Sequence, residues 1–325
     1  MISMKKLVLN TLVYLAAPSL MALPVSAAEY PEQPIRLIAP APAGSLSDSL
    51  ARTIGNALSE AVGQAVVVEN KPGSEGMIAA MYVQKPAPNG YTLLFATNSP
   101  MAAVPAMMKN PPYDAVADFT PISNVGKFTF FLYVNANVPA NTFKELIAYA
   151  KANPGKLSYG TANSTGTVGT AQLIAQTGID MLQVPYKGEP QAMMDLAAGR
   201  IDVMWATPTT GLGMIKEGKV KAIATSLERR SYMLPDVPTI YEAGLPGFSI
   251  VSWGAVFGPA NMPADIVARL NKELTAVMNN PTVIAAVERQ GVTLSPSTPE
   301  ELATYQKSQI KVWKQTVREA RIPLN

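Results

Sequence analysis

The chain lacks the two residue types that most often carry chemistry at neutral pH: its 325 residues include no histidine and no cysteine. Histidine is the usual general base and the commonest metal ligand, and cysteine supplies thiolate nucleophiles and structural zinc sites. Ser–His and Cys–His nucleophile systems and disulfides are therefore excluded. We expect no catalytic residues, no metal site and no cofactor, because an enzyme would have to rely on lysine, tyrosine or carboxylates alone.

The stretch Ile35–Arg52 instead has residue types that suit a bound anion. It predicts a buried strand, then the turn Pro40–Gly44, then a helix whose apolar series begins at Leu46. Ser45 and Asp48 stand three residues apart, as in a capping box. A helix that begins there leaves backbone N–H groups free at the positive end of its dipole, where a carboxylate or phosphate can bind without a cationic side chain. An ordinary strand-to-helix connection is the alternative.

The same strand–turn–helix pattern recurs in the other half of the chain. A strand begins at Leu157, the polar connection Tyr159–Gly169 follows, and a helix is predicted over about Thr167–Thr177, ending at Gly178. Strands that alternate with helices at this interval predict parallel βαβ units in an α/β fold. The pattern fits two lobes or one doubly wound sheet, and periodicity does not separate the two.

Three further segments complete the expected organisation. A loop is predicted over residues 115–122 and a strand over residues 249–257. Near the C-terminus, Thr298 followed by Pro299 and Glu301 predicts a capped start for a long helix.

The first 28 residues predict a signal peptide. Lys5 and Lys6 precede an apolar segment over residues 7–23, and small residues then allow cleavage after Ala27 or Ala28. A membrane anchor is the competing interpretation, and the prolines and small residues at the end of the segment argue against it. No later stretch is apolar and long enough to span a bilayer, so we expect an exported, periplasmic protein.

Length and charge set further bounds. A mature chain of this length suggests two domains. The 26 basic and 23 acidic residues nearly balance, and they balance more closely once Lys5 and Lys6 are removed. Nucleic-acid binding normally requires a strong basic excess or stripe, so we expect no nucleic-acid partner. We expect a monomer.

Nine segments in register carry a resemblance to a known family. Together they span most of residues 30–323, and each is weak by itself. They are Tyr30–Pro31, APAGSLSDSLAR (41–52), VVENKPGSEG (67–76), NGYTLL (89–94), DFTPI (118–122), NPGKLSYG (153–160), VPYKG (184–188), GRIDVMW (199–205) and LPDVPTIYEAGLPG (234–247). The chain resembles the Bug-type (TctC-like) extracytoplasmic solute receptors of the tripartite tricarboxylate transporters.

The resemblance implies a type II periplasmic-binding-protein fold: two α/β lobes with a ligand cleft between them and two crossing segments. After the signal peptide, residues 1–28, it assigns residues 29–127 plus 253–325 to lobe 1 and residues 128–252 to lobe 2. It also implies capture of a small organic carboxylate by hinge closure and delivery to a membrane permease of the same transporter type. A periplasmic sensing component that presents its ligand to a signalling receptor is the alternative, and an enzyme on this fold is a third possibility.

The resemblance also implies where the ligand binds. Backbone amides of the first βα loop, Pro42–Ser45, and of its counterpart, Thr161–Thr167, would hold one carboxylate through charge-assisted hydrogen bonds. Further candidates follow a strand or face the cleft, although Asp202 also suits a local backbone role. The predicted ligand-binding residues are Pro42, Ala43, Gly44, Ser45, Asn98, Ser99, Thr161, Ala162, Asn163, Ser164, Thr165, Gly166, Thr167, Tyr186, Asp202 and Trp253.

Three departures from the family pattern bear on the ligand. Ala43 stands where relatives commonly have the first of two glycines, Gln172 lies near a position that is often histidine, and Ala206 stands where many relatives have aspartate. The last two changes remove polar groups from the expected cleft. They lead to the hypothesis of a ligand with a less polar body than citrate or an amino acid, such as an aromatic carboxylate.

Overall fold

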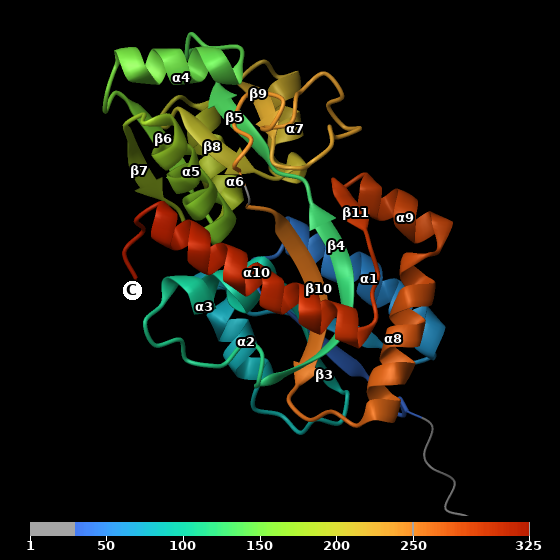
Figure 1. Cartoon of the computed structure of the whole chain (residues 1–325). Coiled ribbons are helices and arrows are strands. Elements are labelled where there is room, and N and C mark those ends of the chain that lie inside the picture. The colour runs from blue at the N-terminus through green and yellow to red at the C-terminus, as the bar shows by residue number, and fades with distance from the viewer. Residues whose placement is uncertain (1–29, 249, 325) are drawn as a thin grey trace, which may run out of the picture. The chain divides into compact units, whose positions relative to one another are not determined.

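The computed structural model describes residues 30–248 and 250–324 (Figure 1). The predicted signal peptide and its cleavage position lie outside the described residues. Within them, no helix combines the length and the hydropathy that a membrane crossing requires.

The first sheet has six strands in the order β11-β4-β10-β3-β1-β2. β1 is parallel to both of its neighbours, whereas β10 runs antiparallel to β3 and β4, and β11 runs antiparallel to β4. Its strands are β1 (Ile35–Ala39), β2 (Val66–Asn70), β3 (Thr92–Thr97), β4 (Phe119–Phe128), β10 (Ser252–Pro259) and β11 (Val292–Leu294).

The second sheet has five strands in the order β7-β6-β8-β5-β9. β6 is parallel to β7 and β8, and β5 is antiparallel to β8 and β9. Two separate sheets exclude the single doubly wound sheet. The strands are β5 (Phe131–Asn135), β6 (Leu157–Thr161), β7 (Met181–Pro185), β8 (Val203–Ala206) and β9 (Val220–Thr225).

The chain passes between the sheets twice, next to strands β4 and β10. β4 ends at Phe128 and β5 of the second sheet begins at Phe131; after the second sheet, the chain re-enters the first at Ser252. β4 and β10 pair with each other along their length, side by side in Figure 1. The predicted division into residues 29–127 plus 253–325 and residues 128–252 stays a prediction.

β4 corrects one expectation. Residues 115–122 were expected to form a loop, but the strand begins at Phe119 and continues to Phe128. Its sequence lacks a clean alternation of apolar and polar residues, and the strand is instead defined by its pairing with β10 and β11, with register shifts along the β10 pairing. Long-range pairing therefore overrides a weak local signal.

Helices cover the sheets, and the long C-terminal helix α10 begins as predicted. Thr298 Oγ1 accepts a hydrogen bond from the Glu301 N–H at 3.2 Å, and the Glu301 carboxylate accepts from the Thr298 N–H at 2.9 Å. α10 packs on β4, α3 and α5, so it contacts elements next to both sheets (Figure 1). The main helices are α1 (Leu46–Val62), α2 (Met77–Val83), α3 (Val104–Met107), α4 (Phe143–Ala152), α5 (Ser164–Thr177), α6 (Glu189–Ala197), α7 (Pro208–Lys216), α8 (Ala264–Met278), α9 (Pro281–Glu288) and α10 (Pro299–Glu319).

Candidate functional site

The first predicted loop, between β1 and α1, ends on a helix cap. Ser45 Oγ accepts a hydrogen bond from the Asp48 N–H at 3.3 Å, and Asp48 Oδ2 accepts from the Gly44 N–H at 2.9 Å. Only the Ser45 half of the predicted capping box therefore forms, because the Ser45 N–H donates to the Pro42 carbonyl at 3.2 Å and Asp48 accepts from Gly44 instead. Gly44 has a φ of 80°, a conformation that suits glycine. Pro42, Ala43 and Gly44 are exposed, so this loop faces solvent.

Asp48 fastens this loop to the neighbouring strand. Its Oδ1 accepts from Asn70 Nδ2 on β2 and lies 2.9 Å from Arg52 Nε. Burial would raise the pKa of the Asp48 carboxyl, but the hydrogen bonds from the Gly44 N–H, Asn70 and Arg52 outweigh burial and lower the pKa. The carboxylate is thus ionised and fully engaged in holding the turn.

The second predicted loop, between β6 and α5, also ends on a cap. Asn163 Oδ1 accepts from the Gly166 N–H at 2.9 Å, so α5 begins at Ser164, three residues before the predicted start at Thr167. The first turn of this helix consists of small and polar residues without an apolar period, which is why sequence reasoning placed the start too late. Asn163 satisfies the Gly166 and Thr167 N–H groups, and the Ser164 N–H donates to the carboxylate of Glu75, so the first turn of α5 already holds an anionic group.

Four of the predicted residues meet across the two sheets. Asn98, just after β3, donates through Nδ2 to Thr165 Oγ1 at 3.0 Å, and the Ser164 and Ser99 hydroxyls share a hydrogen bond of 2.7 Å. All four side chains are buried. The end of β3 and the first turn of α5 therefore form one polar cluster, which we call the α5 cluster: Asn98, Ser99, Ser164 and Thr165.

The α5 cluster is also tied to β10. Asn98 Oδ1 accepts from Ser252 Oγ at 2.8 Å and from the Trp253 N–H at 3.4 Å. Both oxygen and nitrogen of the buried Asn98 amide are thus used, as the cost of an unpaired buried amide requires. Trp253 takes part through its backbone, because its indole is fully buried and packs edge to face on Tyr305 of α10.

Sequence reasoning missed Glu75, which contacts the α5 cluster directly. Its Oε2 accepts from the Ser164 N–H at 2.8 Å and from Ser164 Oγ at 2.6 Å. The residue lies in the turn between β2 and α2, where it has a φ of 56°. The only sequence signal was an acidic residue inside a turn bounded by Gly73 and Gly76.

Glu189, the first residue of α6, was also missed. Its carboxylate binds Asn163 of the second predicted loop. Its Oε1 accepts from Asn163 Nδ2 at 2.9 Å, and its Oε2 accepts from Thr207 N–H and Oγ1 at 3.0 and 2.7 Å. Burial raises the pKa of the Glu189 carboxyl, and these hydrogen bonds oppose the rise without cancelling it. An acidic residue at a helix start looks like an ordinary first-turn acid in sequence, so its inward role gave no separate signal.

Three other predicted residues have local partners. Thr161 is buried at the end of β6 and accepts from Gln183 Nε2 at 3.1 Å. Tyr186 donates its hydroxyl to Asp195 at 2.9 Å. Asp202 lies before β8, at the end of the sheet opposite Thr161, and its carboxylate accepts from Ser158 N–H and Oγ. The structure therefore does not bring Asp202 to the α5 cluster.

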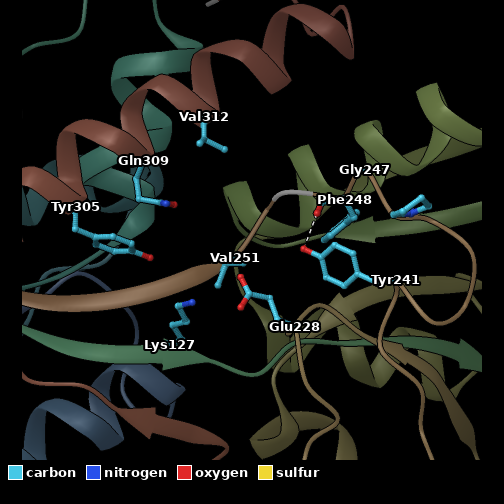
Figure 2. Close-up of a pocket in the computed structure, with 10 residues that line it drawn as sticks. Lys127, Glu228, Tyr241, Gly247, Phe248, Val251, Tyr305, Gln309 and Val312 are labelled. Carbon is cyan, nitrogen blue, oxygen red and sulfur yellow. Dashed lines mark hydrogen bonds between the residues drawn. The ribbon is translucent and has the colours of Figure 1, made fainter.

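A cavity of about 520 Å³ lies at the crossing strands, in a different place from the predicted residues (Figure 2). Lys127 of β4, Glu228, and Tyr305 and Gln309 of α10 direct polar atoms toward it, as Figure 2 shows. On its far side the Tyr241 hydroxyl donates to the Phe248 carbonyl at 2.7 Å. None of the predicted ligand-binding residues lines this cavity.

Residues 30–248 and 250–324 hold no group of three or more histidine, cysteine, aspartate or glutamate side chains that could bind a metal ion. The predicted loops offer hydroxyls, amides and helix-terminal N–H groups, and the carboxylates of Glu75 and Glu189 already accept hydrogen bonds from several of them.

Two α/β sheets joined by two crossing segments, with polar loops at the carboxyl ends of their parallel strands, define a solute-binding protein of the periplasmic-binding type. Similarity to known proteins supports the same class. The family model described as "Tripartite tricarboxylate transporter family receptor" matches residues 50–322. The chain therefore belongs to the tripartite tricarboxylate transporter receptor family. Its members are solute-binding receptors without enzymatic activity.

Individual relatives cover nearly the whole chain. A Pseudomonas sp. (strain P51) protein described as "UPF0065 protein in tcbD-tcbE intergenic region" is 36% identical over 91% of this chain and 89% of its own length. The Rpa4515 structure from R. palustris with adipate is 30% identical with a TM-score of 0.86, covering 91% of this chain and 99% of that one. MatC from Rhodopseudomonas palustris with bound malate is 27% identical with a TM-score of 0.81, covering 89% and 100%.

Proposed function

We propose that this receptor captures a small organic carboxylate between the loops that precede α1 and α5 and delivers it to a membrane permease of the tripartite tricarboxylate type. The observation that carries the proposal is the anion position at the start of α5. There the Ser164 N–H and Oγ together hold a carboxylate oxygen, that of Glu75, at 2.8 and 2.6 Å. The donors at this helix start therefore suit a carboxylate.

Two further facts support the carboxylate. The related structures with adipate and with malate hold carboxylates on the same fold. In this chain, the α5 cluster and the exposed loop before α1 offer hydroxyl and N–H donors but no arginine or lysine side chain. Recognition would therefore rest on helix termini and neutral donors.

The ligand body is proposed to be apolar, as in an aromatic carboxylate. Ala206 is fully buried at the end of β8, where it adds no polar group, and the Gln172 amide is buried and donates to the Gly247 carbonyl at 2.9 Å. Neither residue provides a charge to a polar ligand body. The surroundings of Ala206 and Gln172 are therefore consistent with a ligand whose carbon skeleton is apolar.

A thermal-shift screen of the mature chain tests the proposal. The panel contains benzoate, hexanoate, adipate, malate, citrate and glutamate. A ligand at one hundred times its dissociation constant adds about 2.7 kcal/mol to the free energy of unfolding, so binding appears as a rise in melting temperature. We expect benzoate or hexanoate to give the largest rise. If citrate or glutamate is preferred, the apolar body is wrong, and if no acid raises the melting temperature, the carboxylate proposal is wrong.

Export and delivery complete the proposal. The predicted signal peptide, cleaved after Ala27 or Ala28, would place the mature chain in the periplasm, and membership of the transporter family favours a permease as the partner. Western blotting of periplasmic and membrane fractions, with N-terminal sequencing of the mature chain, checks both the compartment and the cleavage position.

A further inference from the structure

Glu75 occupies the start of α5 in the way that a ligand carboxylate would. One oxygen, Oε2, receives both the Ser164 N–H and the Ser164 hydroxyl, and Ser164 is almost completely buried. The donors come from α5, beside the second sheet, whereas Glu75 follows β2 of the first sheet. The contact therefore links the two halves of the proposed binding region.

The turn that carries Glu75 is fixed in an unusual conformation. Gly73, Ser74, Glu75 and Gly76 all have positive φ angles, and two of them are not glycine. Positive φ is unfavourable for residues with a Cβ atom, so the surrounding structure must hold the turn. Gly76 is enclosed: a Cβ atom there would lie 3.0 Å from Pro40 Cβ and 3.1 Å from Pro100 Cδ.

The packing of Gly76 places the Glu75 side chain at the carboxyl ends of the strands. Pro40 follows β1 directly, and Pro100 lies two residues after Asn98 of the α5 cluster. The turn thus packs between the segment that follows β1 and the segment that follows β3. From this position the Glu75 carboxylate reaches the start of α5.

Among the described residues, Glu75 forms no ion pair with a lysine or arginine side chain. The ion pairs found there are Arg36–Glu69, Arg52–Asp48, Arg200–Asp195, Lys219–Glu217, Arg230–Glu242 and Arg269–Glu273. Glu75 is therefore stabilised by the hydroxyl and N–H of Ser164 and by the positive end of the helix dipole, the same groups that a bound carboxylate would use.

We propose that Glu75 is a built-in carboxylate that fills the anion position of α5 and makes this receptor select monocarboxylates over dicarboxylates. A ligand with one carboxylate binds at the solvent-facing loop before α1 and leaves the Glu75–Ser164 contact in place. A dicarboxylate must either displace Glu75 or bring its second carboxylate next to the Glu75 carboxylate. Two neighbouring negative charges repel each other, so the second carboxylate weakens binding. This inference rests on the proposed function, because it assigns the ligand class for that same site.

The test compares two acids of equal chain length, hexanoate and adipate, by isothermal titration calorimetry. The proteins are the wild type, Glu75→Ala, which empties the anion position, and Glu75→Gln, which keeps an acceptor and removes the charge. Ser74→Gly is the matched control, because it changes the neighbouring residue of positive φ and leaves the carboxylate intact. Glu75 and Ser74 are exposed, so the variants are expected to fold.

We expect the affinity ratio of adipate to hexanoate to rise at least tenfold in Glu75→Ala, which corresponds to about 1.4 kcal/mol. Glu75→Gln should shift the ratio in the same direction by less, and Ser74→Gly should leave it unchanged. An unchanged ratio in Glu75→Ala, with both acids still binding, overturns the role of Glu75 and leaves the receptor function standing. Folded proteins that bind neither these acids nor any other carboxylate of the panel overturn both.

Discussion

Asn98 and Thr165 are joined by a hydrogen bond of 3.0 Å, although one follows a strand of the first sheet and the other lies in the first turn of a helix beside the second. The same Asn98 amide accepts from Ser252, which begins β10. One buried side chain therefore connects the end of β3, the start of α5 and the returning crossing strand. It holds together the elements on which the proposed site depends.

Replacing Asn98 tests the energetic weight of that connection. Asn98→Ala leaves the Ser252 hydroxyl, the Trp253 N–H and the Thr165 hydroxyl without this partner in a buried place. We expect the free energy of unfolding to fall by about 2–3 kcal/mol, since each unpaired buried group costs about 1–3 kcal/mol and the structure relaxes in part. Urea denaturation measures the loss. Asn110→Ala, at an exposed position, serves as control, and equal stability of the two variants would contradict the role of Asn98.

Asp48 should make stability depend on pH in the acid range. Although burial acts to raise the pKa of its carboxyl, hydrogen bonds from Gly44, Asn70 and Arg52 lower it below the ordinary value of 3.8. Because the folded pKa is depressed, its stabilising contribution is present above pH 3.8 and is lost as the pH falls through the folded pKa.

Asp48→Asn is therefore expected to lower the free energy of unfolding at pH 7 by about 1–2 kcal/mol, through loss of charge-assisted bonds in the α1 cap. The difference from wild type should shrink in the acid range. Chemical denaturation at several pH values gives the comparison, and a difference that is the same at pH 7 and pH 3 would be inconsistent with an ionised, stabilising Asp48.

Glu189 should show the opposite sign. Burial raises the pKa of this carboxyl above its ordinary value of 4.5, so the folded state binds the proton more tightly than the unfolded state does. The resulting contribution to the free energy of unfolding is present in full below pH 4.5, and it is lost as the pH rises through the folded pKa. We expect the stability of wild type relative to Glu189→Gln to decrease from pH 4 toward neutrality. Denaturant titrations across that range measure it, and an increase would refute the assignment.

The capping box of α10 offers a test in a region far from the proposed ligand. Thr298→Ala removes the oxygen that accepts from the Glu301 N–H, and N-cap losses of this kind cost about 1 kcal/mol. We expect a matching fall in the free energy of unfolding, whereas Ser308→Ala, at an exposed position within the helix, should change it little. Ligand affinity should be unaffected in both, as calorimetry with the best acid of the panel would show.

The helix starts were accessible to sequence reasoning because a cap is a local contact. Ser45 and Thr298 each accept from an N–H three residues ahead, so residue type and spacing predict the bond without knowledge of the fold. The absence of histidine and cysteine likewise needed only composition. The family resemblance then supplied the two-lobed fold, which the two sheets and the family match confirm.

Tertiary structure alone decided which polar groups meet. Thr165 lies 67 residues from Asn98, and Ser164 lies 89 residues from Glu75, so neither pairing leaves a trace in local spacing. Both depend on how two sheets bring separate loops into hydrogen-bond range. β4 follows the same rule, since its residues pair with β10 and β11 from distant parts of the chain. Capping and composition are properties of a few neighbouring residues, whereas the occupant of the α5 anion position is a property of the whole fold.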